Sequence, residues 1–295
     1  MSDGEQSGRV EAFAHHPRDW RGNLYVYPVI SRRSRGLSIG VNLNPDTACN
    51  FDCIYCQVDR TTPVRVREVK LDVLAAELEH MLALATSGVI FDDPRFGAVP
   101  ASLRRVNDIA FSGDGEPTTC PVFADAVALA ADGRRRHGLD DVKIVLITDA
   151  CYLTRAEVKR GLAIMDANNG EIWAKLDAGT QAYYERVNRP NYPLTHVMEN
   201  ITAAARERPI RIQALFMAID GEPTPEAEIT AFNARLKELV DAGGAVMEVQ
   251  VYTVARQTAE AYVTPLTDAT LRAIAERVRR ETGLAATAYT AAGGS

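Results

Sequence analysis

The chain has 295 residues, of which 46% are apolar and 24% are charged, and its formal net charge is −6 at pH 7. These values are ordinary for a globular protein, and the acidic balance argues against a surface that binds nucleic acid over its whole area. No apolar run reaches the roughly 18 residues that a membrane span needs, and residues 1–10 lack the apolar core of a signal peptide. We therefore expect a cytoplasmic protein that does not bind a membrane.

Short apolar segments rich in Val and Ile alternate with amphipathic segments, which predicts strands followed by helices. The predicted strands are residues 37–43, 108–112, 143–148, 171–176, 210–216 and 247–254. The predicted helices are residues 71–84, 122–137, 155–165, 196–206, 225–242 and 268–281, with Asp268 as the cap of the last one. Six strand–helix units imply parallel pairing with right-handed crossovers. The expected fold class is α/β: a partial (β/α)6 TIM-like barrel, made of a parallel sheet with outer helices.

The two ends of the chain differ in composition from the rest. Residues 1–24 are expected to form a partly flexible N-terminal extension, because they are polar at the start. Residues 25–290 are expected to form one domain. Residues 291–295 are expected to be a flexible tail, because their small residues offer little to pack.

Three of the five cysteines, Cys49, Cys53 and Cys56, lie within eight residues directly after the first predicted strand. Without an export signal, this crowding indicates metal binding or redox chemistry and not a disulfide framework. A structural zinc site prefers four ligands, whereas three cysteines suit a [4Fe–4S] cluster with one open iron. The alternatives are three cysteines without a metal, or a zinc site completed by a distant residue: His15, His16 or Cys120.

A glycine-rich turn with two acids follows the second predicted strand, and we call residues 112–118 the glycine–acid loop. Its candidate cofactor-binding residues are Ser112, Asp114, Gly115, Glu116 and Pro117. Glycine allows close backbone approach or a positive φ, and proline removes a backbone donor. Acids and carbonyl groups suit an ammonium group better than a phosphate. Taken alone, such a turn can simply reverse the chain direction.

Polar residues also stand at the ends of later strands. Lys175 and Asp177 are two residues apart, so their side chains are expected on the same side of a strand. They could hold a carboxylate and a ribose hydroxyl, or they could form a solvated ion pair of little energetic value. Tyr252, on the sixth predicted strand, is a further candidate, which could instead pack in the core.

The cysteine motif, with Tyr55 just before its last cysteine, resembles the signature of the radical S-adenosylmethionine (SAM) superfamily. Gly115, Glu116 and Pro117 resemble the superfamily's Gly-Gly-Glu-Pro motif, with Asp114 in place of the commoner residue. Over residues 25–265 the chain is similar to a branch related to wyosine-type tRNA-modifying Fe–S oxidoreductases. The resemblance implies that the three cysteines hold a [4Fe–4S] cluster whose open iron is chelated by SAM.

The same resemblance implies a role for each candidate site residue. Tyr55 would sit beside the adenine, and the glycine–acid loop would bind the amino group of SAM. Lys175 and Asp177 would lie near the methionine carboxylate and the ribose. The remaining candidate, Tyr252, would lie near the adenine. No side chain is singled out as catalytic.

The function implied is that of a radical SAM enzyme, in which the reduced cluster cleaves SAM to a 5′-deoxyadenosyl radical that abstracts hydrogen from an unidentified substrate. A reductant such as flavodoxin or ferredoxin is the expected partner. A tRNA-modifying, wyosine-like enzyme is one alternative, against which the sequence shows no flavodoxin-like domain and no marked basic surface. A zinc-stabilised α/β binding protein is the alternative from another class.

Overall fold

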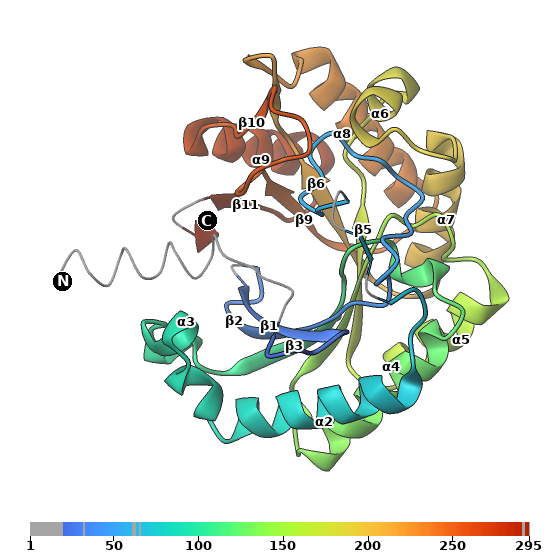
Figure 1. The fold of residues 1–295 in the computed structure, drawn as a ribbon. Helices are drawn as coiled ribbons and strands as arrows, with labels where there is room; N and C mark the ends of the chain where they lie inside the picture. Colours follow the sequence, from blue (N-terminus) through green and yellow to red (C-terminus); the bar gives the residue numbers. More distant parts are fainter. Residues whose placement is uncertain (1–19, 32, 61–62, 65, 291–292, 295) are drawn as a thin grey trace. The chain divides into compact units, whose positions relative to one another are not determined.

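The computed structural model describes residues 20–31, 33–60, 63–64, 66–290 and 293–294. The chain forms two compact units, each assembled from separate stretches of sequence (Figure 1). Unit 1 comprises residues 1–48, 63–146 and 156–171, and unit 2 comprises residues 49–62, 147–155 and 172–295. His15, His16 and most of the expected extension and tail lie outside the described residues, so the boundaries at residues 24 and 290 stay predictions.

Unit 1 is built on strands in the order β1, β2, β3 and β4. Strand β2 (Gly36–Val41) is buried at all six positions, as is typical of a strand covered on both faces. It pairs in parallel with β3 (Val106–Phe111), and β3 pairs in parallel with β4 (Lys143–Thr148), most of which lies in this unit. An antiparallel hairpin adds β1 (Val26–Ser31) at the edge of β2.

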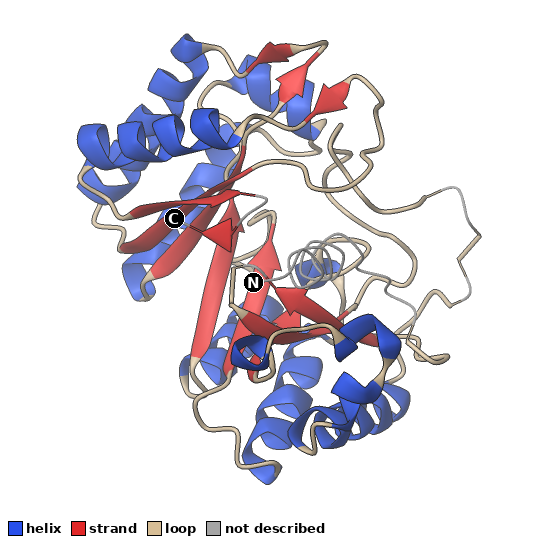
Figure 2. Cartoon of the chain, turned by 90° about the vertical axis from the view of Figure 1, so that its left-hand side faces the viewer, coloured by secondary structure: helices blue, strands red, loops and turns tan. Residues whose placement is uncertain are grey.

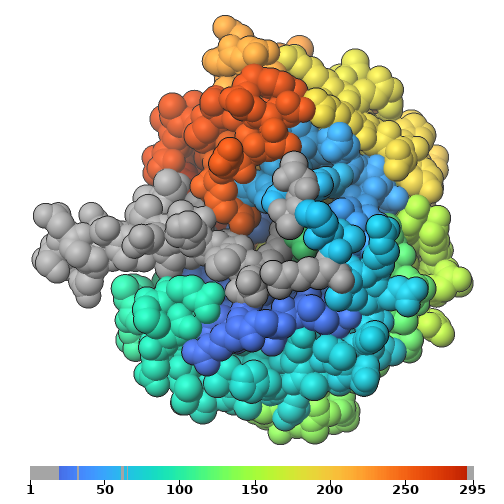
Figure 3. Space-filling view, viewed as in Figure 1, coloured from blue at the N-terminus to red at the C-terminus, as the bar shows by residue number. Residues whose placement is uncertain are grey.

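Three helices cover these strands in unit 1: α2 (Leu71–Thr86), α4 (Phe123–Arg136) and α5 (Ala156–Asp166). Leu74, Leu78 and Met81 recur at helical spacing and form the buried face of α2, while its opposite face reaches the molecular surface (Figure 3). Helix α4 packs against both α2 and α5. Short turns connect α2 to β3: η1 (Val89–Asp92), α3 (Pro94–Gly97) and η2 (Ala101–Leu103).

Unit 2 is also built on parallel strands, with helices lying along them (Figure 2). The strands follow the order β5 (Gly170–Lys175), β6 (Ile210–Leu215), β9 (Val246–Tyr252) and β11 (Ala286–Thr290), and β12 (Gly293–Gly294) pairs antiparallel with β11. The helices are α6 (Gln181–Asn188), α7 (Leu194–Glu207), α8 (Glu226–Asp241) and α9 (Asp268–Thr282). A small antiparallel sheet joins β10 (Val263–Thr264), β7 (Ala218–Ile219) and β8 (Glu222–Pro223).

The structure contains every strand and helix predicted from the sequence, with ends shifted by a few residues. The cap of α9 is a correction: the Thr267 hydroxyl, and not Asp268, accepts the N–H of Thr270, at 3.1 Å. Asp268 is instead the first helical residue, where a negative charge still favours the helix N-terminus. Among the described residues, no helix combines the length and the apolar character needed to span a membrane.

Candidate functional site

The glycine–acid loop in unit 1 is in direct backbone contact with the segment that ends at Ala48. A Cβ atom on Gly115 would lie 1.9 Å from the Ala48 carbonyl oxygen, a distance that no real Cβ occupies. The N–H of Glu116 donates to the same oxygen at 3.0 Å. Glycine is therefore required at position 115 because two main chains meet there.

The side chain of Asn42, which follows β2, ties the loop to its neighbouring strand. Its Oδ1 accepts the N–H groups of Asp114 (3.1 Å) and Asn44 (3.0 Å), and its Nδ2 donates to the Asp114 carboxylate at 2.6 Å. The Tyr27 hydroxyl donates to the Ser112 carbonyl oxygen at 3.0 Å. The sequence prediction missed Asn42, whose only signal is a polar residue at the end of a buried strand.

The carboxylate of Glu116 is buried and is used by the loop itself. Glu116 is 2% exposed, and its carboxylate accepts both the N–H (3.0 Å) and the hydroxyl (2.5 Å) of Thr118. In this way Glu116 caps the short turn η3 (Pro117–Thr119). Pro117 occupies the first position of that turn, where a backbone donor is not needed. The five candidate residues of the loop thus form one closely bonded turn within unit 1.

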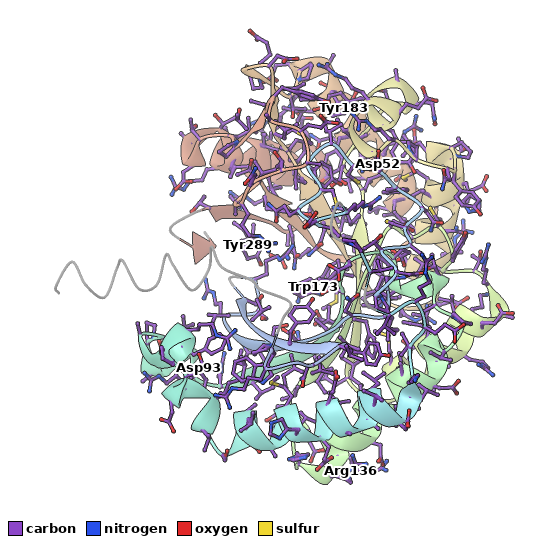
Figure 4. The ribbon with its side chains drawn as sticks, viewed as in Figure 1. Asp52, Asp93, Arg136, Trp173, Tyr183 and Tyr289 are labelled. Carbon is purple, nitrogen blue, oxygen red and sulfur yellow. The ribbon has the colours of Figure 1, made fainter. Side chains whose placement is uncertain are left out.

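The cysteine loop, residues 49–57, belongs to unit 2 and is bound by main-chain hydrogen bonds on two sides. On one side it pairs with the end of α6 and the residues after it; Figure 4 labels Asp52 in the loop and Tyr183 on α6. The bonds on that side run from Asp52 N–H to Asn188 O (3.0 Å), from Ile54 N–H to Val187 O (3.0 Å) and from Asn191 N–H to Asn50 O (2.9 Å). On the other side, Ala259 N–H donates to Cys56 O (2.8 Å) and Glu260 N–H to Ile54 O (3.2 Å).

All five cysteines lie in the described part of the chain, and none of them forms a disulfide. Cys53 is buried, whereas Cys49 and Cys56 are half-buried. Burial raises the pKa of the Cys53 thiol to about 12, so without a metal this thiol keeps its proton at neutral pH. A metal would have to displace that proton to bind the sulfur.

The donor set on this loop fits an iron–sulfur cluster in its chemistry, because it supplies three cysteine thiols, none in a disulfide, within eight residues. In the described residues, no three side chains of the types His, Cys, Asp and Glu already converge as metal ligands. Binding would therefore require the thiols to turn toward a common centre. Of the other cysteines, Cys151 is buried and Cys120 is half-buried.

Buried polar side chains in unit 2 meet at the carboxylate of Asp177, whose side chain is 1% exposed. The Lys175 ammonium lies 3.2 Å from Asp177 Oδ2 and donates to the Tyr252 hydroxyl at 3.0 Å. The Tyr55 hydroxyl donates to Asp177 Oδ2, and the Leu215 N–H donates to Oδ1 at 2.9 Å. The structure thus brings together four of the residues that the sequence singled out in this unit: Tyr55, Lys175, Asp177 and Tyr252.

Charge and burial act in opposite directions on the pKa of Lys175. Burial is the largest single effect and lowers this pKa, but the nearby Asp177, Tyr252 and Cys53 together outweigh it and raise it. The pKa of Tyr55 is also raised, chiefly by burial and next by the Asp177 charge. Lys175 therefore stays a cation and Tyr55 stays a neutral donor at physiological pH.

The amide of Asn188, the last residue of α6, completes this cluster and was not predicted from the sequence. Its Nδ2 lies 3.0 Å from Asp177 Oδ2, 3.0 Å from the Tyr55 hydroxyl and 3.5 Å from the Cys53 sulfur. Nothing in the sequence indicates this role, because Asn188 is 135 residues from Cys53 and belongs to a helix that was not predicted. Among the described residues, Asn188 Oδ1, Gln213 Oε1 and Tyr184 Oη are buried without a protein partner.

Sequence comparison finds distant relatives of this chain, and no protein-family model matches it. A UPF0026 protein of Helicobacter pylori (strain 26695) is 24% identical over 72% of the chain and 61% of that protein. A UPF0026 protein of Methanocaldococcus jannaschii is 26% identical over 57% of the chain and 44% of that protein. A GTPase Obg of Brachyspira hyodysenteriae is 25% identical over 56% of the chain and 20% of that protein. The chain thus spans less than two thirds of the length of these relatives.

Comparison of folds finds SuiB of Streptococcus suis, with a TM-score of 0.57 and 15% identity over 87% of this chain and 51% of that one. The structure of SuiB bound to S-adenosylmethionine matches with a TM-score of 0.53 and 14% identity, over 87% of this chain and 49% of that one. This likeness confirms the fold class expected from the sequence, an α/β fold of the partial (β/α)6 barrel kind with a parallel sheet and outer helices.

Proposed function

We propose that this chain is a radical SAM enzyme of the Fe–S oxidoreductase type. In this proposal Cys49, Cys53 and Cys56 hold a [4Fe–4S] cluster. When bound, the cluster and SAM supply reductive cleavage of SAM to a 5′-deoxyadenosyl radical that abstracts hydrogen from a substrate. A small reductant such as flavodoxin or ferredoxin supplies the electron.

The observation that carries the proposal is the contact between the cysteine loop and the cluster of polar side chains within unit 2. One amide, that of Asn188, lies within hydrogen-bonding distance of both Cys53 and Asp177, which itself pairs with Lys175. A structural zinc site does not need a buried ammonium–carboxylate pair beside it. A site that binds the carboxylate of an amino acid, such as the methionine part of SAM, needs a buried cation, and a carboxylate beside that cation compensates for its burial.

Lys175 is the residue that would bind the carboxylate of SAM. An ammonium group has three N–H donors, and Asp177 and Tyr252 account for two of them. The third remains for a ligand. Because its pKa is raised, Lys175 brings a full positive charge to that contact.

Asp177 acts here chiefly as an orienting group and less as a direct ligand of the ribose. Its carboxylate already accepts from Tyr55, Asn188, Leu215 and Lys175, which uses most of its lone pairs. It therefore fixes the direction of the Lys175 ammonium and of the Tyr55 ring. In unit 1, the Glu116 carboxylate is turned inward onto Thr118, so the glycine–acid loop would offer its main chain to an ammonium group.

The test is anaerobic reconstitution with iron and sulfide, followed by SAM and dithionite and an assay of 5′-deoxyadenosine. We expect a brown protein with about four iron and four sulfide per chain, and nucleoside formation that Cys53→Ala abolishes. Cys151→Ala is the matched control, because Cys151 is another buried cysteine of unit 2 that forms no disulfide and lies outside the motif. It should keep both the cluster and the activity.

One result would overturn the proposal, and another would remove the evidence for the three cysteines as ligands. A colourless protein that retains one zinc and forms no nucleoside would favour the zinc-stabilised binding protein instead. Equal loss of the cluster in Cys53→Ala and Cys151→Ala would mean that these substitutions act through folding and do not identify the ligands.

A further inference from the structure

Asn188 is a buried side-chain amide whose NH2 group, with two N–H donors, lies within hydrogen-bonding distance of three acceptors. It is 1% exposed, and its Nδ2 faces Cys53 Sγ at 3.5 Å, the Tyr55 hydroxyl at 3.0 Å and Asp177 Oδ2 at 3.0 Å. Its own carbonyl oxygen accepts the N–H of Asp52 in the cysteine loop at 3.0 Å. Both its main chain and its side chain therefore bind the loop that carries the cysteines.

The chemistry of the neighbours fixes which end of the amide faces them. A carboxylate only accepts hydrogen bonds, and so does the Cys53 sulfur once a metal has displaced its proton. The proton of the Tyr55 hydroxyl is given to Asp177, so this oxygen also accepts from Asn188. The opposite orientation would place Oδ1 against three acceptors, and it is excluded on that ground.

A donor to a ligating sulfur changes the electron affinity of an iron–sulfur cluster. Reduction adds negative charge to the cluster, and an N–H group directed at the sulfur stabilises the more negative state. The effect is enlarged in this location because the amide is buried and water cannot replace it. The same amide also holds Asp177, which orients Lys175.

We propose that Asn188 is a positioning residue that raises the reduction potential of the cluster through Cys53 and links that ligand to the Asp177–Lys175 pair. The inference rests on the proposed radical SAM function. It predicts that the potential depends on a residue outside the cysteine motif. It also predicts that SAM affinity and cluster potential change together when this one amide is removed.

The experiment is a potentiometric titration of the reconstituted cluster, followed by electron paramagnetic resonance, in the wild type and in Asn188→Ala. We expect the equilibrium for reduction to fall about tenfold, which is 59 mV for a one-electron couple. SAM binding to the variant, measured by the change that it causes in the cluster spectrum, should weaken as well.

Asn233→Ala is the matched control. Asn233 is a helical asparagine of unit 2, is 1% exposed and donates its Nδ2 to Glu281 at 2.8 Å, while its buried Oδ1 has no partner among the residues that the structure describes. It shares the burial and hydrogen bonding of Asn188 but has no hydrogen bond to the cysteine loop. Its removal should lower stability while the cluster potential keeps its wild-type value.

The outcomes separate this inference from the function on which it rests. A wild type that binds no iron–sulfur cluster overturns both. A wild-type cluster whose potential is unchanged in Asn188→Ala overturns the role of Asn188 alone, and so does an equal shift in Asn233→Ala. If Asn188→Ala does not load, Asn188→Asp keeps the shape of the side chain but replaces the donor by an acceptor. Its potential must then lie below that of the wild type, and an equal potential overturns the inference.

Discussion

The glycine–acid loop of unit 1 and the polar cluster of unit 2 reach a fixed geometry by different means. In the loop, main chain contacts main chain: Gly115 lies against Ala48, and Glu116 N–H donates to the same carbonyl. In the cluster, buried ionised and polar side chains hold each other, with Asp177 at the centre. The loop therefore depends on the absence of a side chain, whereas the cluster depends on the presence of several.

This difference predicts which substitutions each region can accept. A site formed by main-chain contacts is disrupted by steric overlap when a Cβ atom is added. A site formed by charged side chains is destabilised when one charge loses its partner. The two failures can be told apart, because the first acts through packing and the second through electrostatics.

The largest effect is expected for Lys175→Met in unit 2. The substitution leaves the buried Asp177 carboxylate without its cation, and breaking a buried pair in this way usually costs about 3–5 kcal/mol. We expect about 3 kcal/mol in the metal-free protein, at the lower end of that range, because Tyr55, Asn188 and Leu215 still donate to the carboxylate. Urea denaturation measures this loss.

Arg235→Met supplies the control for that measurement. Arg235 pairs with Glu238 at 2.7 Å, where the two side chains are 37% and 57% exposed, and it also donates to the Gly179 carbonyl oxygen at 2.9 Å. Such surface pairs contribute about 0–1 kcal/mol. If the two variants lost the same stability, the cluster around Asp177 would not be the electrostatic centre that we describe.

The second largest effect is expected for Gly115→Ala in unit 1. The new Cβ would overlap a backbone oxygen, which cannot rotate away, so the loop must move and lose the Glu116–Ala48 hydrogen bond. We expect a loss of about 2 kcal/mol, together with loss of SAM binding. Gly97→Ala, where the nearest atom is 3.8 Å from the added Cβ, should be tolerated. Equal thermal stability of Gly115→Ala and Gly97→Ala would contradict the backbone contact.

The fold and the two loops could be predicted from the sequence more completely than the group of polar side chains around Asp177, for physical reasons. Strand and helix periodicity is local, and all six predicted strands appear as β2, β3, β4, β5, β6 and β9. The cysteine motif and the glycine–acid loop are also contiguous, so their residues could be named together. Helix α6 was missed: its mixed pattern of Tyr, Glu, Arg and Asn has no long apolar stripe.

Asn42 and Asn188 could not be found in the same way. Each acts on residues far along the chain: Asn42 on Asp114, 72 residues away, and Asn188 on Cys53, 135 residues away. Asparagine is common at turns and helix ends for local reasons, so its type alone carries no signal. Only the arrangement of the folded chain shows which donor faces which acceptor.

A smaller change in stability should separate the backbone and side-chain roles of Arg189, which follows α6. Its backbone is left-handed, with φ of 43°, and its side chain reaches Glu260 (2.7 Å), Asp52 (3.5 Å) and the Tyr262 hydroxyl (3.2 Å). Arg189→Ala should lose about 1 kcal/mol with these partly exposed contacts. Arg189→Gly loses the same contacts but relieves about 1 kcal/mol of backbone strain, so its stability should match the wild type.

Both Arg189 variants should release iron to a chelator faster than the wild type, because Asp52 and Glu260 anchor opposite sides of the cysteine loop. Iron release is followed by absorbance. Slower release from Arg189→Gly than from Arg189→Ala would mean that global stability, and not this anchoring, controls the loss of iron.

The smallest effect on stability is expected for Asp108→Asn. It should have the opposite sign to the effect of Asp177→Asn. Burial of Asp108 on β3 raises its pKa, an effect that the Ser38 hydroxyl and the Arg33 charge oppose and the Glu171 charge assists. The folded protein thus binds this proton more tightly than the unfolded chain, so stability falls as the pH rises from about 4 through the raised pKa. Asp108→Asn removes that loss and should add on the order of 0.5 kcal/mol at pH 7, with no gain below about pH 4.

Asp177→Asn should instead destabilise the protein at pH 7, because it leaves the buried Lys175 ammonium without its counter-charge. Denaturation curves at pH 4 and pH 7 measure the change in the free energy of unfolding for both variants. If that change had the same sign for both at pH 7, the two carboxylates would be held in the same way.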